Sequence, residues 1–128
     1  MEALAVVEHN TIAVEIVQLL QRCRFDLSTE KHLQAGVEQA LRGAGFDFAR
    51  EKRLSSQDIP DFLVSGGVVI ECKMRNKSSK MEVFRQISRY AEHAEVTAII
   101  LASNMSMGLP PELNGKPLYS ASLSRGWL

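Results

Sequence analysis

Apolar residues near the start of the chain recur three or four positions apart, which predicts an amphipathic helix. These positions are Val6, Ile12, Ile16, Val17, Leu19 and Leu20. Such an apolar face either packs on a sheet or pairs with a second subunit. We therefore interpret residues 1–26 as an N-terminal helical extension.

A second helical pattern covers Ser28–Arg42, with Ser and Thr available as N-caps and Gly43-Ala44-Gly45 as a stop. Its apolar positions are Leu33, Val37, Ala40, Leu41 and Ala44. The alternating segment Phe46–Arg50 then predicts the first strand of a sheet.

Two apolar runs rich in β-branched residues follow, Asp61–Val64 and Val68–Lys73. They are separated by Ser65-Gly66-Gly67, which predicts a tight turn between antiparallel strands. Met81–Tyr90 has helical spacing, and Val96–Ala102 is apolar without alternation, as is typical of a strand buried on both faces.

A strand, a helix and a strand in succession imply a right-handed crossover and a parallel pair. Residues 28–102 thus predict an α/β core of helix, three meandering strands, helix and strand. Residues 103–128 add a loop at Pro110-Pro111 and an edge strand over Pro117–Ala121. A chain of 128 residues with 45% apolar residues is large enough to form one domain with its own core.

The predicted hairpin brings charged side chains together. Asp61 opens its first strand and Glu71 lies near the end of its second, so antiparallel pairing places them side by side. Glu71 and Lys73 are two residues apart and leave the same face of the strand, whereas Cys72 points to the other face. Three charged groups therefore converge on one patch.

This trio suits metal-dependent cleavage of a phosphodiester. Mg²⁺ prefers hard oxygen ligands, which Asp61, Glu71 and the backbone carbonyl of Cys72 can supply. Lys73 beside them can hold a nucleophilic water or neutralise charge on the phosphate. The alternative is a set of solvated rim residues with an ion pair worth below about 1 kcal/mol.

The residues Pro60-Asp61, the hairpin and Glu71-Cys72-Lys73 resemble the signature of the PD-(D/E)xK nuclease superfamily, and the resemblance extends over residues 28–102. It implies a restriction-endonuclease-like α-β-β-β-α-β core, here with an additional N-terminal helix. It also implies Mg²⁺-dependent hydrolysis of DNA, with Mn²⁺ as a substitute, in which Asp61, Glu71 and Lys73 are catalytic.

The resemblance further implies roles for the two core helices. Glu30 and Gln34 look like the first motif of the virus-type replication-repair nucleases, with Glu38 as the competing acid. Gln86 and Tyr90 are similar to the Gln-x-x-x-Tyr motif of RecB-like members. Glu30 and Gln86 thus join the catalytic set, and Gln34 and Tyr90 join the nucleic-acid contacts. Alternatively, Glu30 serves the helix dipole and Tyr90 is an ordinary half-buried aromatic.

The net charge of zero is unusual for a protein that binds a phosphate backbone. Positive charge is nevertheless concentrated between residues 73 and 89, where Glu82 is the sole acid. Besides Lys73, this segment offers five basic residues for contacts with DNA: Arg75, Lys77, Lys80, Arg85 and Arg89. The alternative is a solvated loop and helix face.

Several classes of protein are disfavoured. Cys23 and Cys72 are too few and too far apart for a zinc site or a disulfide framework. The sequence has no Gly-rich phosphate loop and no Ser nucleophile elbow. It also lacks an apolar run of membrane-spanning length and a basic signal-peptide region, so we expect a cytoplasmic protein without a membrane contact.

The leading hypothesis is a Mg²⁺-dependent DNA endonuclease of repair or recombination that acts on branched, flap or junction DNA. Small nucleases that cut both strands often work as symmetric dimers, so we expect a homodimer. The alternatives are a non-catalytic nucleic-acid-binding or assembly module with a nuclease-like fold, and a nuclease subunit that needs a protein partner. Intact Asp61, Glu71 and Lys73 argue against the non-catalytic module.

Overall fold

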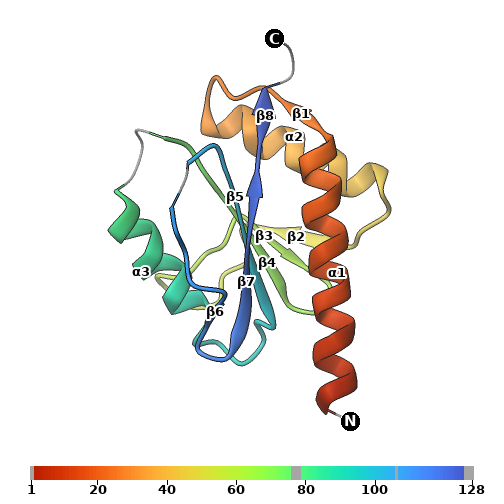
Figure 1. Ribbon diagram of the computed structural model, residues 1–128, viewed down its shortest axis with the longest axis vertical. Coiled ribbons are helices and arrows are strands. Elements are labelled where there is room, and N and C mark those ends of the chain that lie inside the picture. Colours follow the sequence, from red (N-terminus) through yellow and green to blue (C-terminus); the bar gives the residue numbers. More distant parts are fainter. Residues whose placement is uncertain (1, 76–78, 106, 126–128) are drawn as a thin grey trace.

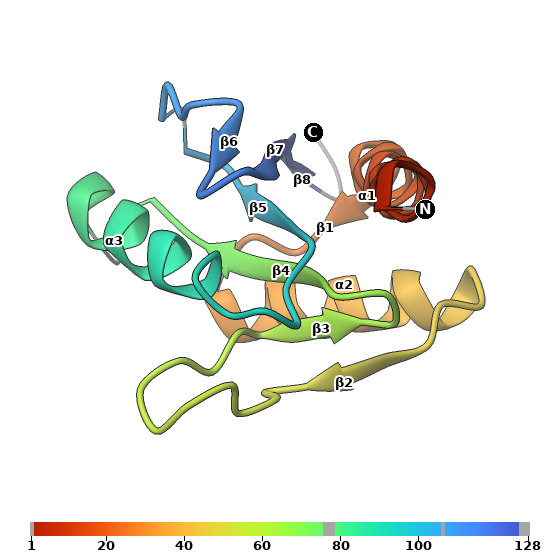
Figure 2. The same ribbon diagram turned by 90° about the horizontal axis from the view of Figure 1, so that it is seen from below.

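The computed structural model describes residues 2–75, 79–105 and 107–125, and its elements form three layers. A mixed sheet lies in the middle, and helices cover both of its faces (Figures 1 and 2). The helices are α1 (Glu2–Arg22), α2 (Glu30–Gly43) and α3 (Lys80–Tyr90). The protein is therefore an α/β protein, as the sequence predicts.

Six strands form the central sheet. In spatial order they are β2 (Phe48–Arg50), β3 (Phe62–Val64), β4 (Val68–Lys73), β5 (Ala98–Ser103), β7 (Lys116–Ser122) and β6 (Glu112–Leu113). The three strands β2, β3 and β4 meander antiparallel, and β4, β5 and β7 are parallel. The crossover through α3 accounts for the parallel pair of β4 and β5. A separate parallel pair joins β1 (Arg24–Phe25) to β8 (Ser124–Arg125).

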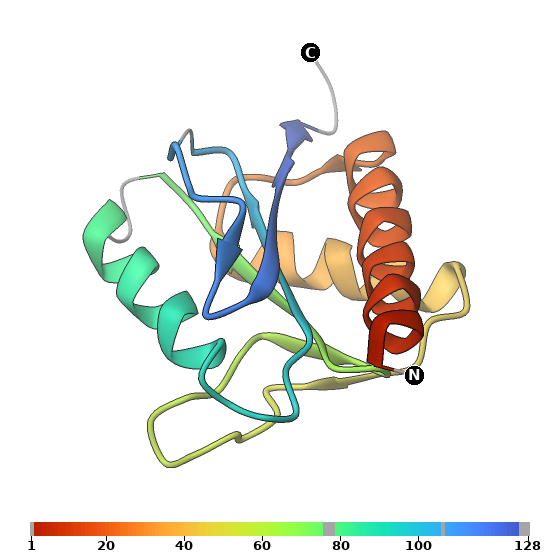
Figure 3. The same ribbon diagram turned by 60° about the horizontal axis from the view of Figure 1, so that its bottom comes forward.

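Alternate residues of β4 serve two different cores, because successive side chains of a strand point to opposite faces. Val68, Ile70 and Cys72 belong to the core that α1 and α2 cover. Val69 belongs to the core that α3 covers. Figure 3 shows α1 and α3 on opposite sides of the strands. The predicted orientation of Cys72, away from Glu71 and Lys73, is confirmed.

The β3–β4 turn sets the register of the hairpin. Gly66 and Gly67 have φ angles of 99° and 90°, which glycine adopts without strain. A Cβ atom at Gly67 would also lie 2.3 Å from the backbone oxygen of Glu95, so a side chain cannot be accommodated there. Phe62 pairs with Ile70 in the resulting register, which puts the preceding residue, Asp61, opposite Glu71.

The apolar face of α1 packs inside the molecule. Ala13, Ile16 and Leu20 are fully buried, and α1 contacts β4, β5, β7 and α2. Of the two roles considered for this face, packing on the sheet is the one observed. The helix ends at Arg22, because residues 24 and 25 form β1, so the predicted extension to residue 26 was too long.

The C-terminal part also differs in detail from the prediction. The expected edge strand is β7, but the two-residue strand β6 pairs with its first two residues through a hairpin. Such a short strand has too few residues to show an alternating pattern. Within the described residues, no helix combines the length and the apolar character needed to cross a membrane.

Candidate active site

Asp61 and Glu71 face each other where the hairpin opens. The backbone N–H of Asp61 donates to Glu71 Oε1 at 3.2 Å, and the backbone N–H of Cys72 donates to Asp61 Oδ2 at 2.8 Å. Each carboxylate thus accepts a hydrogen bond from the partner strand. The C-terminal end of β4, which carries Glu71, lies between α2 and α3 (Figure 2).

Two further groups hold the Glu71 carboxylate. Lys73 Nζ lies 3.2 Å from Glu71 Oε2, and the Tyr90 hydroxyl donates to Glu71 Oε1 at 3.2 Å. Glu71 is only 2% exposed and Tyr90 is completely buried. The side chain of Lys73 is 13% exposed and lines a hollow, so Lys73 lies at the opening of the cluster. Asp61, Glu71 and Lys73 therefore come together as the sequence predicts.

The two carboxylates are held in an environment that disfavours their charge. Burial, opposed by the hydrogen bond from Cys72 N–H and the charge of Lys73, raises the pKa of Asp61 to about 6. Burial and the neighbouring Asp61 raise the pKa of Glu71 to about 7, although Lys73 again opposes the shift. One lysine faces two acids, so the cluster has an excess of negative charge when both acids are ionised.

These residues fit a hard divalent cation. Mg²⁺ is usually held by one or two carboxylates together with waters and phosphate oxygens, and Asp61 and Glu71 are such a pair. The N–H and C=O of one strand residue point to the same side. Because the Cys72 N–H points to Asp61, its carbonyl faces that side as well. Among the described residues, no three His, Cys, Asp or Glu side chains gather into a larger cage.

Helix α2 contributes Gln34 and Glu30 to the same region. Gln34 Nε2 donates to Asp61 Oδ1 at 3.3 Å, so Gln34 contacts the candidate ligand itself. The charge of Glu30 also raises the pKa of Asp61. Glu38 is held elsewhere, with Oε1 2.6 Å from Arg50 Nη1 and Oε2 2.6 Å from Arg42 Nη2. Of the two competing acids, Glu30 is thus the one whose charge acts on Asp61.

Helix α3 places Gln86 in a hollow beside the lysine. This hollow has a volume of about 370 Å³ and is lined by Lys73, Glu82, Val83, Arg85, Gln86 and Arg89. Its lining includes three cations and one carboxylate, and two of the cations, Lys73 and Arg89, also pair with Glu71 and Asp58. The Oε1 atom of Glu82 also accepts a hydrogen bond from Ser79 Oγ at the start of α3.

Two predicted nucleic-acid contacts have internal partners. The Tyr90 side chain is buried and its hydroxyl donates to Glu71 Oε1, so in this structure it is not available for the predicted contact with nucleic acid. Arg89 Nε donates to Asp58 Oδ1 at 2.8 Å, which leaves only the rest of its half-exposed guanidinium for a ligand.

The other basic residues differ in how they are held. Lys80 and Arg85 are exposed. Arg75 is tied to Asn104, whose side-chain oxygen accepts from the Arg75 backbone N–H at 3.0 Å. Lys77 lies outside the described residues.

Sequence reasoning missed Arg50, Asp58 and His93. Arg50 donates to Gln34 Oε1 at 3.1 Å, and His93 Nε2 lies 2.9 Å from Asp58 Oδ2. Asp58 is 7% exposed, which is low for an aspartate outside a sheet. None of the three belongs to a recognisable motif, because their partners are distant in the sequence.

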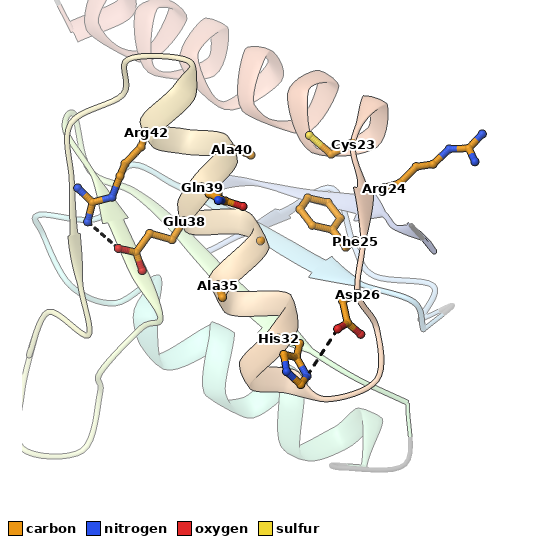
Figure 4. Close-up of a pocket in the computed structure, with 11 residues that line it drawn as sticks. Cys23, Arg24, Phe25, Asp26, His32, Ala35, Glu38, Gln39, Ala40 and Arg42 are labelled. Carbon is orange, nitrogen blue, oxygen red and sulfur yellow. Dashed lines mark hydrogen bonds and ion pairs between the residues drawn. The ribbon is translucent and has the colours of Figure 1, made fainter. Parts of the chain in front are cut away.

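A larger hollow, of about 740 Å³, lies on the outer face of α2 and does not include the Asp61–Glu71–Lys73 cluster. Figure 4 shows Phe25 and the side chains of α2 around it, with Arg24 pointing outward. Gly36 also lines this hollow and packs closely on Phe25, because a Cβ atom at Gly36 would lie 2.7 Å from the Phe25 ring. Among the acids and bases around it, Asp26 lies 3.8 Å from His32 and Glu38 pairs with Arg42.

Comparison of the chain with protein-family models, with curated proteins and with solved structures found no match. The functional interpretation therefore depends on the geometry and chemistry of the chain itself.

Proposed function

We propose that the protein is a Mg²⁺-dependent nuclease that hydrolyses phosphodiester bonds of DNA, with a restriction-endonuclease-like core. The observation that carries this proposal is the facing pair of carboxylates, that of Glu71 buried and that of Asp61 partly buried, with Lys73 3.2 Å from Glu71. Buried acids with raised pKa values are unfavourable for folding, and they are typical of functional sites. A bound cation would remove their mutual repulsion.

Asp61, Glu71 and the Cys72 carbonyl are the groups that would hold the metal. A bound Mg²⁺ supplies Lewis acidity and neutralises negative charge at a phosphate. Lys73, at the opening of the cluster, holds the attacking water or stabilises the charge that develops on the phosphate. Gln86, which lines the hollow beside Lys73, orients the site. Glu30 assists from α2 through its charge, which acts on Asp61.

The cations around the hollow support the choice of a phosphate-containing polymer as substrate. Arg85 and the free part of Arg89 lie next to Lys73, so a phosphate seated there would adjoin the candidate metal site. The exposed Lys80 extends the positive charge along α3. Branched, flap or junction DNA is the proposed form of the substrate, and a homodimer is the proposed assembly.

Cleavage of a labelled panel of single-stranded, duplex, flap and four-way-junction DNA tests the proposal. The wild type is compared with Lys73→Met and Glu71→Gln in Mg²⁺ and in Mn²⁺. We expect each substitution to lower the rate by about 10²–10⁴-fold, as for loss of a general acid or base. Lys52→Met and Glu112→Gln, which change exposed residues of the same types, are the controls and should cleave like the wild type.

The same panel separates the alternatives. Cleavage that persists in both site variants would contradict the proposed catalytic set. Failure of the wild type to cleave any substrate, with DNA binding retained, would favour a non-catalytic module. Cleavage that appears only on adding a protein partner would indicate a subunit of a larger nuclease. Light scattering at micromolar concentration that returns a monomer mass would contradict the homodimer.

A further inference from the structure

Gln34 bridges Arg50 on β2 and Asp61 at the start of β3. Its Nε2 donates to Asp61 Oδ1 at 3.3 Å, and its Oε1 accepts from Arg50 Nη2 at 3.1 Å. A guanidinium group has donors and no acceptor, so only the oxygen end of the amide can face Arg50. The NH₂ end must then face Asp61. Arg50 thereby determines which way the Gln34 amide points.

Arg50 is itself held firmly. Its Nη1 donates to Glu38 Oε1 at 2.6 Å, and its guanidinium carbon lies 4.7 Å from the centroid of the Phe62 ring. Its Nε is buried and has no hydrogen-bond partner among the described residues. A buried donor without a partner is unfavourable, so the other contacts of Arg50 must outweigh this cost. The Arg50 guanidinium is therefore held in one position, and the Gln34 amide is oriented against it.

Asp61 receives one donor on each oxygen. Gln34 Nε2 contacts Oδ1, and the backbone N–H of Cys72 contacts Oδ2 at 2.8 Å. Two donors from different elements fix the plane of the carboxylate, and an ionised carboxylate still has acceptor sites left for a cation. Residues that orient metal ligands in this way affect metal affinity strongly.

We propose that Arg50, acting through Gln34, is a positioning residue that orients the Asp61 carboxylate for a divalent cation. This inference rests on the proposed metal site. It gives Gln34 a role toward Asp61 in place of a contact with nucleic acid. Glu38 then anchors Arg50 and takes no part in the chemistry.

Calorimetric titration with Mn²⁺ alone tests this role without any cleavage assay. We expect Arg50→Met and Gln34→Met each to weaken Mn²⁺ binding by roughly 10-fold or more, as for other residues that support metal ligands. The double variant should bind no more weakly than Gln34→Met, because Arg50 acts through Gln34. Arg50→Lys, which keeps a donor for the Gln34 oxygen, should recover part of the affinity.

Arg42→Met is the matched control, since Arg42 also pairs with Glu38 and lies over an aromatic ring, that of Phe48, 5.4 Å from its centroid. It should bind Mn²⁺ like the wild type. If Arg50→Met lowers the thermal midpoint and leaves Mn²⁺ affinity unchanged, Arg50 is merely structural and this inference is overturned. If Arg50→Met does not fold, Gln34→Met, which leaves the Arg50–Glu38 pair intact, decides in the same way. Absence of Mn²⁺ binding by the wild type would overturn the proposed metal site as well.

Discussion

Asp58 and Asp61 are three residues apart, and their carboxylates have pKa values shifted in opposite directions. Burial acts to raise the pKa of Asp58, but hydrogen bonds and charges from His93 and Arg89 hold it below its ordinary value. Burial raises the pKa of Asp61 to about 6, because the hydrogen bond from the Cys72 N–H and the charge of Lys73 do not outweigh it. Burial acts to raise the pKa of both aspartates, and only at Asp58 do the paired cationic partners outweigh it.

This contrast indicates a structural role for the Asp58 cluster. Asp58 fastens the β2–β3 loop to the end of α3, and its charge is already compensated. Asp61 and Glu71 are ordered by backbone N–H groups but retain uncompensated negative charge. A fold keeps such an arrangement at a cost to its stability, as is common at functional sites.

The largest expected change in stability follows from Asp58→Asn. The substitution removes the charge that Arg89 and His93 contact, so we expect the free energy of unfolding to fall by about 2 kcal/mol. Urea denaturation at pH 7 measures this. Asp47→Asn, at an exposed aspartate, should change the value by less than about 0.5 kcal/mol. An unchanged midpoint for Asp58→Asn would refute its structural role.

The corresponding substitution at Asp61, Asp61→Asn, should change the free energy of unfolding in the opposite direction. An ordinary pKa of 3.8 raised to about 6 sets an upper limit of about 3 kcal/mol on the destabilisation by the ionised group. Loss of the charged acceptor for the Cys72 N–H offsets part of this gain. We expect Asp61→Asn to raise the free energy of unfolding by about 1–2 kcal/mol at pH 8. If Asp61→Asn instead lowered the free energy of unfolding as much as Asp58→Asn does, the proposed difference between the two aspartates would be contradicted.

The Asp61–Glu71 pairing was predictable because it depends on local rules. The pleat of β4 and the Gly66-Gly67 turn determine which residues of the hairpin face each other. Both can be predicted from the sequence. The helices and the long strands were predicted for the same reason, since their periodic patterns extend over many residues.

The supporting residues were not predictable. The partner of Arg50 lies sixteen residues away on α2, and the partners of Asp58 lie on and just after α3. These contacts depend on how distant elements pack, which no local pattern encodes. Tyr90 shows the same limit, because helical spacing indicates an inward face but not that the hydroxyl meets Glu71. Two-residue strands such as β6 have no period to detect.

Stability should depend on pH through the raised acids. Between their ordinary pKa values, 3.8 and 4.5, and the raised values of about 6 and 7, the folded protein holds more protons than the unfolded chain. Stability contributed by Asp61 and Glu71 is therefore lost as the pH rises from about 4 to about 7. Asp58, with a lowered pKa, loses its contribution only at acidic pH, below this window. Thermal unfolding of the wild type and of Asp61→Asn across this pH range measures the contribution of Asp61. The pH-dependent contributions that both proteins share cancel in the difference between their midpoints.

Mg²⁺ should reverse this loss at pH 8. A ligand at ten times its dissociation constant stabilises the folded state by about 1.4 kcal/mol. We expect MgCl₂ to raise the midpoint of the wild type, and to have a much smaller effect on Asp61→Asn and at pH 5. NaCl of equal ionic strength controls for screening. An equal rise in both proteins would mean that the ion acts elsewhere.

The smallest expected effect concerns two exposed arginines, Arg85 and Arg24. Arg85 lines the hollow beside Lys73, whereas Arg24 borders the larger hollow on the far side of α2 (Figure 4). Arg85→Ala should reduce the slope of log affinity against log salt concentration by about 1, since one phosphate contact is lost. Arg24→Ala should leave the slope unchanged. Fluorescence anisotropy with labelled DNA and EDTA, which prevents cleavage, measures both slopes. If Arg24→Ala changes the slope and Arg85→Ala does not, DNA binds at the outer face of α2, and the hollow beside the carboxylate pair is not where the backbone lies.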